Sequence, residues 1–167
     1  MHTIEKKSLK VGKYVNNDHV DSVIRTYKQE RWVNNSNHIG KADSLSSWYS
    51  VEELEEFLET VKMNGGDGVR FYFGAYPADF TGKPDYAGRQ TIVLVATRSK
   101  EVDENVINKD LYTHTDGKPA ILAYNLGALC PPICPPPSGG SGPSGKAVPF
   151  EIGMAIVENG DNGMTLV

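Results

Sequence analysis

Apolar residues at helical spacing follow residue 50 and give the clearest local pattern in the chain. Ser50 and Glu53 have the S-x-x-E spacing of a capping box, in which each side chain bonds a free backbone N–H at the start of a helix. Five apolar residues then share one face, and most of the glutamates fall opposite them: Val51, Leu54, Phe57, Leu58 and Val61. Gly65 and Gly66 are expected to end this helix.

A second helical pattern comes earlier, over residues 20–33. Asn17 or Asp18 is placed to cap its start, and the polar run at residues 34–37 is expected to end it. Four apolar side chains form its stripe, three or four positions apart: Val20, Val23, Ile24 and Tyr27.

Strand patterns dominate the centre of the chain. Apolar and polar residues alternate over residues 69–73, and residues 91–97 form a nearly continuous β-branched and apolar run. Such a run indicates a central strand that is covered on both faces. The connection at residues 77–88 is rich in Pro, Gly and Asp and long for a hairpin, and long ordered loops are often functional.

Turn residues predict two hairpins besides this pair. Asp116-Gly117 separates apolar residues 111–113 from residues 120–122, and two Asn-Gly pairs at residues 159–163 indicate a terminal hairpin. Residues 1–15 also suggest a short first strand, with Leu9, Val11 and Val15 as its apolar positions. The separate helix and strand runs predict an α+β fold, with a mainly antiparallel sheet and two helices packed on one face.

A Pro/Gly/Ser-rich stretch covers about residues 131–146. Its composition cannot bury a core, and it favours polyproline II at the start and a flexible coil afterwards. The strand-like residues that follow, 150–167, are too few to fold alone. We therefore expect one domain over residues 1–167 with this stretch as an internal loop.

Charge and hydropathy exclude some classes of function. The formal net charge is -4, and a mildly acidic chain lacks the basic face that nucleic acids require. The longest apolar stretch, residues 92–96, is too short to cross a bilayer. The first ten residues contain no apolar signal region. We expect a cytoplasmic protein that binds neither nucleic acid nor a membrane.

The only two cysteines are Cys130 and Cys134, separated by Pro131, Pro132 and Ile133. A zinc site needs closer cysteine pairs and further ligands, and the four histidines have no matching spacing. We expect two structural or incidental thiols, with a local disulfide as the alternative in an oxidising setting. No metal or cofactor is expected, because P-loop, dinucleotide, zincin and EF-hand motifs are all missing from the sequence.

The best candidate for a binding site is polar and lies between Arg70 and Arg89. Arg70 and Tyr72 share one side of a strand, Tyr76 lies on the long connection, and Arg89 precedes the next strand. Two guanidinium groups in one pocket would suit a carboxylate or phosphate ligand. The competing interpretation, which we favour, is a solvent-facing sheet surface where Arg and Tyr pair for stability.

Four stretches resemble a group of bacterial proteins that have no assigned activity. They are Trp48-Tyr49-Ser50, DGVRFYFGAYP from Asp67, GRQT from Gly88, and LAYNLGALCPP from Leu122. The resemblance covers about the middle half of the chain. It implies a bacterial, cytoplasmic origin and assigns no catalytic residue.

Three functions are compatible with these patterns. The preferred one is a non-enzymatic binding or assembly protein, which partners another protein or itself through strand edges. The alternative is a small enzyme or an anionic-ligand-binding protein that uses Arg70, Tyr72, Tyr76 and Arg89. The third is a regulatory or immunity-type protein that blocks a partner with its acidic helix face.

Overall fold

The fold is given by a computed structural model that describes residues 10–103, 105–134, 158–160 and 163–165. The helical elements are α1 (Asn17–Tyr27), a π-helical turn η1 (Lys28–Trp32), α2 (Val33–Ile39), α3 (Val51–Met63) and a 3-10 turn η2 (Pro84–Tyr86). The strands are β1 (Ser46–Trp48), β2 (Gly68–Ala75), β3 (Gln90–Val102), β4 (Asn105–Asp110), β5 (Tyr112–Thr115), β6 (Lys118–Ile121), β7 (Ala123–Tyr124), β8 (Ala128–Cys130), β9 (Glu158–Gly160) and β10 (Gly163–Thr165).

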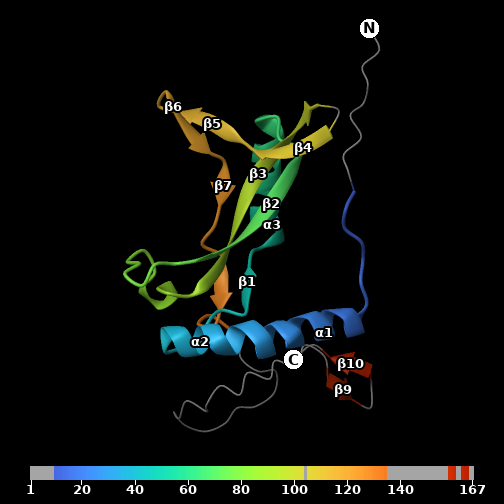
Figure 1. The fold of residues 1–167 in the computed structure, drawn as a ribbon, viewed down its shortest axis with the longest axis vertical. Coiled ribbons are helices and arrows are strands. Elements are labelled where there is room, and N and C mark those ends of the chain that lie inside the picture. Colours follow the sequence, from blue (N-terminus) through green and yellow to red (C-terminus); the bar gives the residue numbers. More distant parts are fainter. Residues whose placement is uncertain (1–9, 104, 135–157, 161–162, 166–167) are drawn as a thin grey trace.

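The expected α+β class is confirmed, because helices combine with sheets whose strand pairs are all antiparallel in the described residues. The main sheet has the order β2-β3-β4, and β7 also pairs with β3. Helix α3 covers one face of this sheet, whereas the helix formed by α1, η1 and α2 crosses the end of the sheet near the start of β3 (Figure 1). We expected both helices on one face of the sheet, whereas α3 lies on a face and the first helix lies across the end.

The first helix is longer than its sequence pattern predicts. Asn16, rather than Asn17 or Asp18, caps it by accepting from the His19 N–H at 3.1 Å. The polar run at residues 34–37 does not end it, since α2 continues to Ile39 and stops at Gly40 with φ 70°. Asparagine is only mildly unfavourable inside a helix, whereas glycine readily adopts this left-handed conformation.

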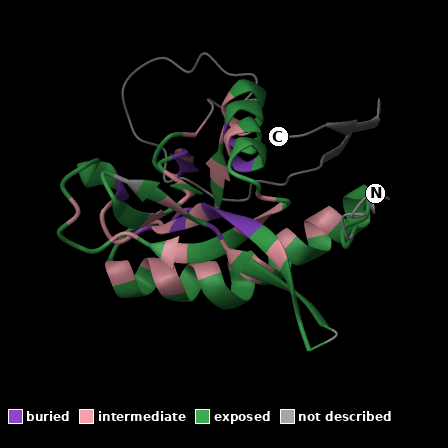
Figure 2. Cartoon of the chain, turned by 90° about the horizontal axis from the view of Figure 1, so that it is seen from above, coloured by how far each residue is buried: buried purple, intermediate pink, exposed green. Residues whose placement is uncertain are grey.

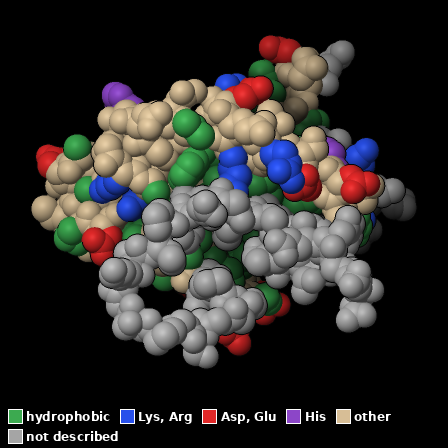
Figure 3. Space-filling view, turned by 90° about the horizontal axis from the view of Figure 1, so that it is seen from below, with side chains coloured by type: hydrophobic (Ala, Val, Ile, Leu, Met, Phe, Trp, Pro, Cys, Tyr) green, Lys and Arg blue, Asp and Glu red, His purple; other side chains and the backbone are tan. Residues whose placement is uncertain are grey.

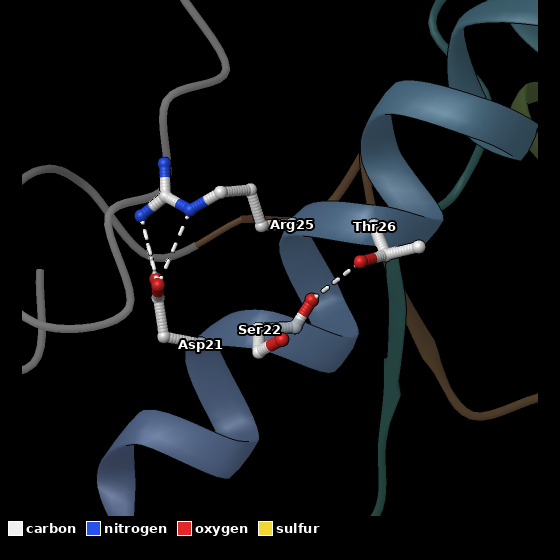
Figure 4. A network of polar contacts seen from close by, with 4 residues as sticks. All are labelled: Asp21, Ser22, Arg25 and Thr26. Carbon is white, nitrogen blue, oxygen red and sulfur yellow. Dashed lines mark hydrogen bonds and ion pairs between the residues drawn. The ribbon is translucent and has the colours of Figure 1, made fainter.

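Charged and hydroxyl side chains support the outer side of α1 (Figure 4). Arg25 donates to Asp21 one turn earlier, with a shortest N–O distance of 2.7 Å, and Thr26 Oγ1 donates to the Ser22 carbonyl at 2.8 Å. The Arg25–Asp21 pair is exposed, so we expect it to contribute only about 0.3–0.5 kcal/mol. It marks a solvated helix face rather than a binding site.

Helix α3 begins where the sequence predicts. Ser50 Oγ accepts from the Glu53 N–H at 3.1 Å, and Glu53 Oε2 accepts from the Ser50 N–H at 2.9 Å, which completes the capping box. After the helix, Gly65 adopts φ 75°. Arg98 on β3 donates to the Asn64 and Gly65 carbonyls, which places a cation at the negative end of the helix.

The core lies between α3 and β3. Phe57 and Val61 of α3 pack with Leu94 and Ala96 of β3 and with Leu111, and all five are buried. Figure 2 shows the buried residues concentrated in the strands of the sheet and on the side of α3 that faces them. The prediction of a covered central strand over residues 91–97 is confirmed, since most of its residues are buried.

Both predicted hairpins are confirmed. Tyr112 pairs with Ile121 across the turn formed by Asp116 and Gly117, whose φ angles are 52° and 75°. Gly160 pairs with Gly163 in the β9–β10 hairpin. The short first strand is wrong for the part that the structure describes, because residues 10–15 form no regular element and Val11 is 94% exposed.

The two cysteines form a disulfide, so the expected free thiols are replaced by the local disulfide alternative. β8 carries Cys130, and the turn after it, in which the Ile133 N–H bonds the Leu129 carbonyl, brings Cys134 back. The two Cα atoms lie 4.7 Å apart, within the usual range for a disulfide. Residues 135–146 of the Pro/Gly/Ser-rich stretch lie outside the described residues, and the single-domain organisation stays a prediction.

Candidate functional site

The four residues of the sequence-predicted polar site form two separate groups. Arg70 and Tyr72 lie in β2, whereas Tyr76 and Arg89 lie beyond its end and join through the Tyr76 N–H and the Arg89 carbonyl at 2.9 Å. A strand rises about 3.3 Å per residue, so Arg70 and Tyr76 are roughly 20 Å apart along the chain. None of the four lines the pocket between α3 and β2 or the small pocket beside β1.

Arg70 and Tyr72 share one side of β2, as the sequence predicts, and both bind Asp110 of β4. Arg70 Nη1 bonds Asp110 Oδ1, while the Tyr72 hydroxyl donates to Oδ2 at 2.7 Å. Arg70 Nη2 also donates to the Asn108 carbonyl at 2.6 Å. The hydrogen bond that Arg70 Nη1 donates to the Tyr72 hydroxyl at 3.2 Å, followed by the charge of Asp110, raises the pKa of Arg70. An anionic ligand would have to displace Asp110 from this cluster.

Tyr76 and Arg89 are part of the packing of the long connection. The Tyr76 hydroxyl contacts Asn125 Oδ1, and its ring stacks on Phe80 with centroids 4.5 Å apart. Burial raises the pKa of Tyr76, so its hydroxyl stays neutral at physiological pH. The long connection therefore has an ordered structural role in this fold.

Arg89 is only 8% exposed. Its Nε donates to the Asp85 carbonyl at 2.8 Å, and its buried Nη1 has no hydrogen-bond partner in the described part of the chain. Burial lowers the pKa of Arg89, and the charges of Asp43 and Asp85 partly oppose this shift. Two carboxylates thus already act on the guanidinium, and Arg89 is too deeply buried to meet a ligand from solvent.

A different site lies on the opposite face of β2, against α3. An apolar groove of roughly 320 Å³ runs between these elements. Leu54, Leu58 and Val61 of α3 form one wall, Val69 and Phe71 of β2 form the other, and Leu94 lies below. We call this the α3–β2 groove.

The wall formed by β2 exposes large aromatic side chains. Phe71 is 59% exposed and Phe73 is 83% exposed, while Leu58 across the groove is 42% exposed. Phe71 and Phe73 pair with Leu94 and Ile92 of β3, which sets them on the face that α3 covers. Contiguous exposed apolar side chains of this size commonly mark an interaction surface.

The backbone of β2 is unpaired on its outer side. Among the described residues, β2 pairs with β3 alone. Thr97 accepts from the Asp67 N–H, whereas Ala96 bonds Leu122 and Leu111 on the other side of β3. Along antiparallel strands, the backbone groups of successive residues point alternately to the two sides. Ala96 faces away from β2 and pairs with Val69, so the N–H and C=O groups of Val69, Phe71 and Phe73 point away from β3. We call these groups the β2 edge.

The edge and the groove share Val69 and Phe71, and Phe73 continues the edge beside the groove. Val69, Phe71 and Phe73 present backbone groups outward and carry their side chains on the face of the sheet that α3 covers. An extended chain placed beside them could form main-chain hydrogen bonds and insert every second side chain into the groove. This is a binding geometry, and it needs no catalytic group.

No family model, no curated protein and no solved structure matches this chain. The α3–β2 groove therefore has to be interpreted from its own geometry. The resemblance to bacterial proteins of unassigned activity stays a prediction.

Among the described residues, no helix combines the length and the apolar character needed to span a membrane. The His, Cys, Asp and Glu side chains of the same residues form no cluster of three or more that could hold a metal ion. On the face drawn in Figure 3, the visible Lys and Arg side chains are interspersed with Asp and Glu rather than gathered in one field.

Sequence reasoning missed the α3–β2 groove because it assigned importance to the polar side of β2. Phe71 and Phe73 were visible as alternating apolar residues, which normally face a core. The signal in the sequence that could have indicated the groove is that large side chains occupy both faces of β2. Whether the strand lies at an edge depends on its neighbours, which alternation does not specify.

Proposed function

We propose that this protein is a non-enzymatic binding protein that accepts an extended, apolar strand of a protein partner at the β2 edge. The observation that carries the proposal is the coincidence of the unpaired β2 backbone with the exposed Phe71 and Phe73 beside the α3–β2 groove. Main-chain hydrogen bonds would provide affinity, and the groove would select apolar side chains at alternate positions.

Localisation and the other partner expectations remain predictions. A cytoplasmic, bacterial protein that binds no nucleic acid fits the acidic composition. The disulfide between Cys130 and Cys134 is more usual in oxidising compartments. Binding at the β2 edge is compatible with either setting.

The alternative, anionic-ligand binding at the polar residues, has weaker support. Arg70 is already bonded to Asp110, and Arg89 is buried against Asp43 and Asp85. The third function, blocking through the acidic helix face, would use the glutamates of α3 that point away from the sheet. No contact in the described residues favours it over the groove.

The test is titration with a capped ten-residue peptide in which valine or phenylalanine alternates with lysine or threonine. Amide chemical shifts of the full chain would report where it binds. We expect the largest shifts at Val69, Phe71 and Phe73, and at least tenfold weaker binding by Phe73→Lys. Phe73 is so exposed that this change should leave the fold intact.

Val106→Lys is the matched control, because Val106 is 47% exposed on β4 at a distance from β2. It should bind the peptide within twofold of the unmodified chain. Equal binding by Phe73→Lys and the unmodified chain, or shifts confined to Arg70 and Tyr72, would contradict the proposal.

A further inference from the structure

The sequence of β2 is nearly symmetric about Phe71. In either direction from Phe71, the chain has a long side chain with a polar tip, then a large apolar residue, then a glycine. The matched positions are Arg70 with Tyr72, Val69 with Phe73, and Gly68 with Gly74. An antiparallel pair of two identical strands can bring such matched positions directly opposite each other. β2 is therefore complementary to a second copy of itself.

We infer that the partner strand at the β2 edge is the β2 edge of a second copy of this chain, paired antiparallel about a two-fold axis at Phe71. The inference rests on the proposed function, because it names the partner of the same site. A two-fold interface uses the same surface of both copies, so every contact away from the axis is made twice. The two main sheets would join into one continuous sheet.

The backbone groups of the two β2 edges match in this register. Val69, Phe71 and Phe73 direct their N–H and C=O groups away from β3. Phe71 would face Phe71 of the second copy, and Val69 would face Phe73 of the second copy. Directly opposite residues of this kind exchange both of their hydrogen bonds. The pairing would therefore satisfy the groups of the β2 edge in both copies.

Charge disfavours a neighbouring register in which the axis lies at Arg70. That register would place Arg70 directly opposite Arg70 of the second copy, and like charges at opposite positions destabilise a sheet. With the axis at Phe71, Arg70 instead faces Tyr72 of the second copy. A guanidinium group is attracted to the face of a tyrosine ring, and Arg70 already lies 5.7 Å from the centroid of its own Tyr72 ring.

The α3–β2 groove disfavours the other neighbouring register, in which the axis lies at Tyr72. Val69 lines the groove, and with the axis at Phe71 its opposite residue is Phe73 of the second copy. Side chains of directly opposite residues lie about 5 Å apart on one face of a sheet. The aromatic ring of each copy would thus reach the groove of the other. An axis at Tyr72 would put the small Ala75 opposite Val69 and leave the groove without a ring.

The two α3 helices leave room for this pairing. Phe57 of α3 is buried with Leu94 of β3 and stacks on Tyr124 of β7, so α3 lies over β3 and β7 rather than over the edge of β2. In the joined sheet the two β3 strands would be three strand spacings apart, about 14 Å. Helices in direct contact lie about 8–10 Å apart. The wider gap would accommodate Phe71 and Phe73 of both copies.

The exposed aromatic surface of β2 is sufficient for a weak, reversible dimer. Phe71 is 59% exposed and Phe73 is 83% exposed. Since an aromatic side chain can bury roughly 150–250 Å², covering both rings in both copies buries roughly 600 Å², about half of what the smaller stable interfaces bury. The paired backbone and the exposed Leu58 beside the groove would add to this area. We expect a dissociation constant in the micromolar range.

The first experiment measures mass by light scattering on the full chain over a range of protein concentrations. Phe71→Lys places like charges opposite each other at the axis, and Val106→Lys makes the same type of change at an exposed position of β4. We expect the mass to rise from one chain to two with concentration in the unmodified chain and in Val106→Lys, and to stay that of one chain in Phe71→Lys. The alternating peptide should return the unmodified chain to the mass of one chain, because both ligands compete for one edge.

A cysteine at the axis tests the register. Phe71→Cys would place two Cα atoms about 5.5 Å apart across the axis, within the range for a disulfide. Phe73→Cys is the matched control, because the two copies of this position would lie roughly 14 Å apart on opposite sides of the axis. With oxidised glutathione as oxidant, we expect Phe71→Cys to form a covalent dimer at least tenfold faster than Phe73→Cys.

Other outcomes separate this inference from the proposed function. The mass of one chain at every concentration, together with peptide binding at the β2 edge, would overturn the inference and uphold the function. A dimer that persists in Phe71→Lys, or that crosslinks equally through both cysteine positions, would overturn pairing at Phe71. Crosslinking of Phe71→Cys alone, without peptide binding by any of the proteins, would uphold the second copy as the partner and overturn binding of a separate protein.

Discussion

Asp43 Oδ1 accepts a hydrogen bond of 2.6 Å from the backbone N–H of Gln90. The same oxygen accepts from the Ser44 N–H at 2.7 Å, and the carbonyl of Asp43 accepts from Trp32 Nε1 at 2.8 Å. Asp43 is only 3% exposed. One buried aspartate therefore connects the first helix to the start of the central strand.

Replacing Asp43 by alanine should lower the free energy of unfolding by about 3 kcal/mol. The change leaves the buried Ser44 N–H and the half-buried Gln90 N–H without an acceptor and removes a charge that acts on Arg89. Urea denaturation measures the effect. Asp21→Ala is the control, because its pair with Arg25 is exposed, and we expect a loss below about 0.5 kcal/mol. Equal losses in both variants would contradict this role of Asp43.

Tyr86→Phe should destabilise the fold by about 1–3 kcal/mol. The Tyr86 side chain is 1% exposed, and its hydroxyl donates to the Gly127 carbonyl at 3.0 Å and accepts from the Leu129 N–H at 3.2 Å. Removal of the hydroxyl leaves both buried backbone groups unsatisfied. Thermal unfolding compares this variant with Tyr112→Phe, whose ring is 59% exposed and whose change should be near zero.

Glu53→Gln should lower the thermal midpoint at neutral pH but not in acid. Backbone and side-chain hydrogen bonds from Ser50, followed by the bond from Tyr124, lower the pKa of Glu53. A lowered pKa in the folded state means that the carboxylate stabilises the fold above its unfolded pKa of about 4.3. That contribution is lost as the pH falls through the folded pKa.

The pH dependence of the midpoint measures this prediction. The difference between the unmodified chain and Glu53→Gln should be constant from about pH 7 to 5 and should shrink below about pH 4. Glu59→Gln is the control, since Glu59 lies on the exposed side of α3 outside the capping box. A difference in thermal midpoint that persists at low pH would show that the charge of Glu53 does not cause the stabilisation.

Cys134→Ser should destabilise the chain by about 2 kcal/mol, the loop-entropy value for a disulfide that closes so short a loop. Cys134 is the more exposed partner, so the substitution avoids a buried polar group at Cys130. A reductant should have the same effect on the unmodified chain and none on Cys134→Ser. Insensitivity of both proteins to the reductant would indicate that the bond does not form.

Local signals predicted the elements that local interactions determine. The capping box at Ser50 and Glu53 located the start of α3, and Asp116-Gly117 located the turn of the β5–β6 hairpin, where both residues have positive φ. The first helix was predicted too short because its continuation depends on contacts with Asp43, which lies beyond the helical pattern. Ser36 Oγ accepts from the Asp43 N–H and Trp32 bonds the Asp43 carbonyl, which holds α2 in place beyond the polar run.

Pairing between distant segments accounts for most of what sequence patterns missed. β4, β7 and the β1–β8 pair are short and carry weak alternation, so their assignment depends on their neighbours. The shared side of Arg70 and Tyr72 followed from period two, but their partner Asp110 lies forty positions away. Likewise, the exposure of Phe73 follows from the position of β2 in the sheet order.

The pairing of β1 with β8 has a consequence for synthesis on the ribosome. Ser46 pairs with Cys130, and the Leu45 N–H bonds the Cys130 carbonyl, so β1 has no strand partner among the described residues until β8 has been made. The β2–β3 and β3–β4 pairs join nearby segments and can form earlier. A nascent chain that stalls before residue 128 would thus carry a partly folded sheet with an unpaired β1, and such intermediates are the species that chaperones and proteases recognise.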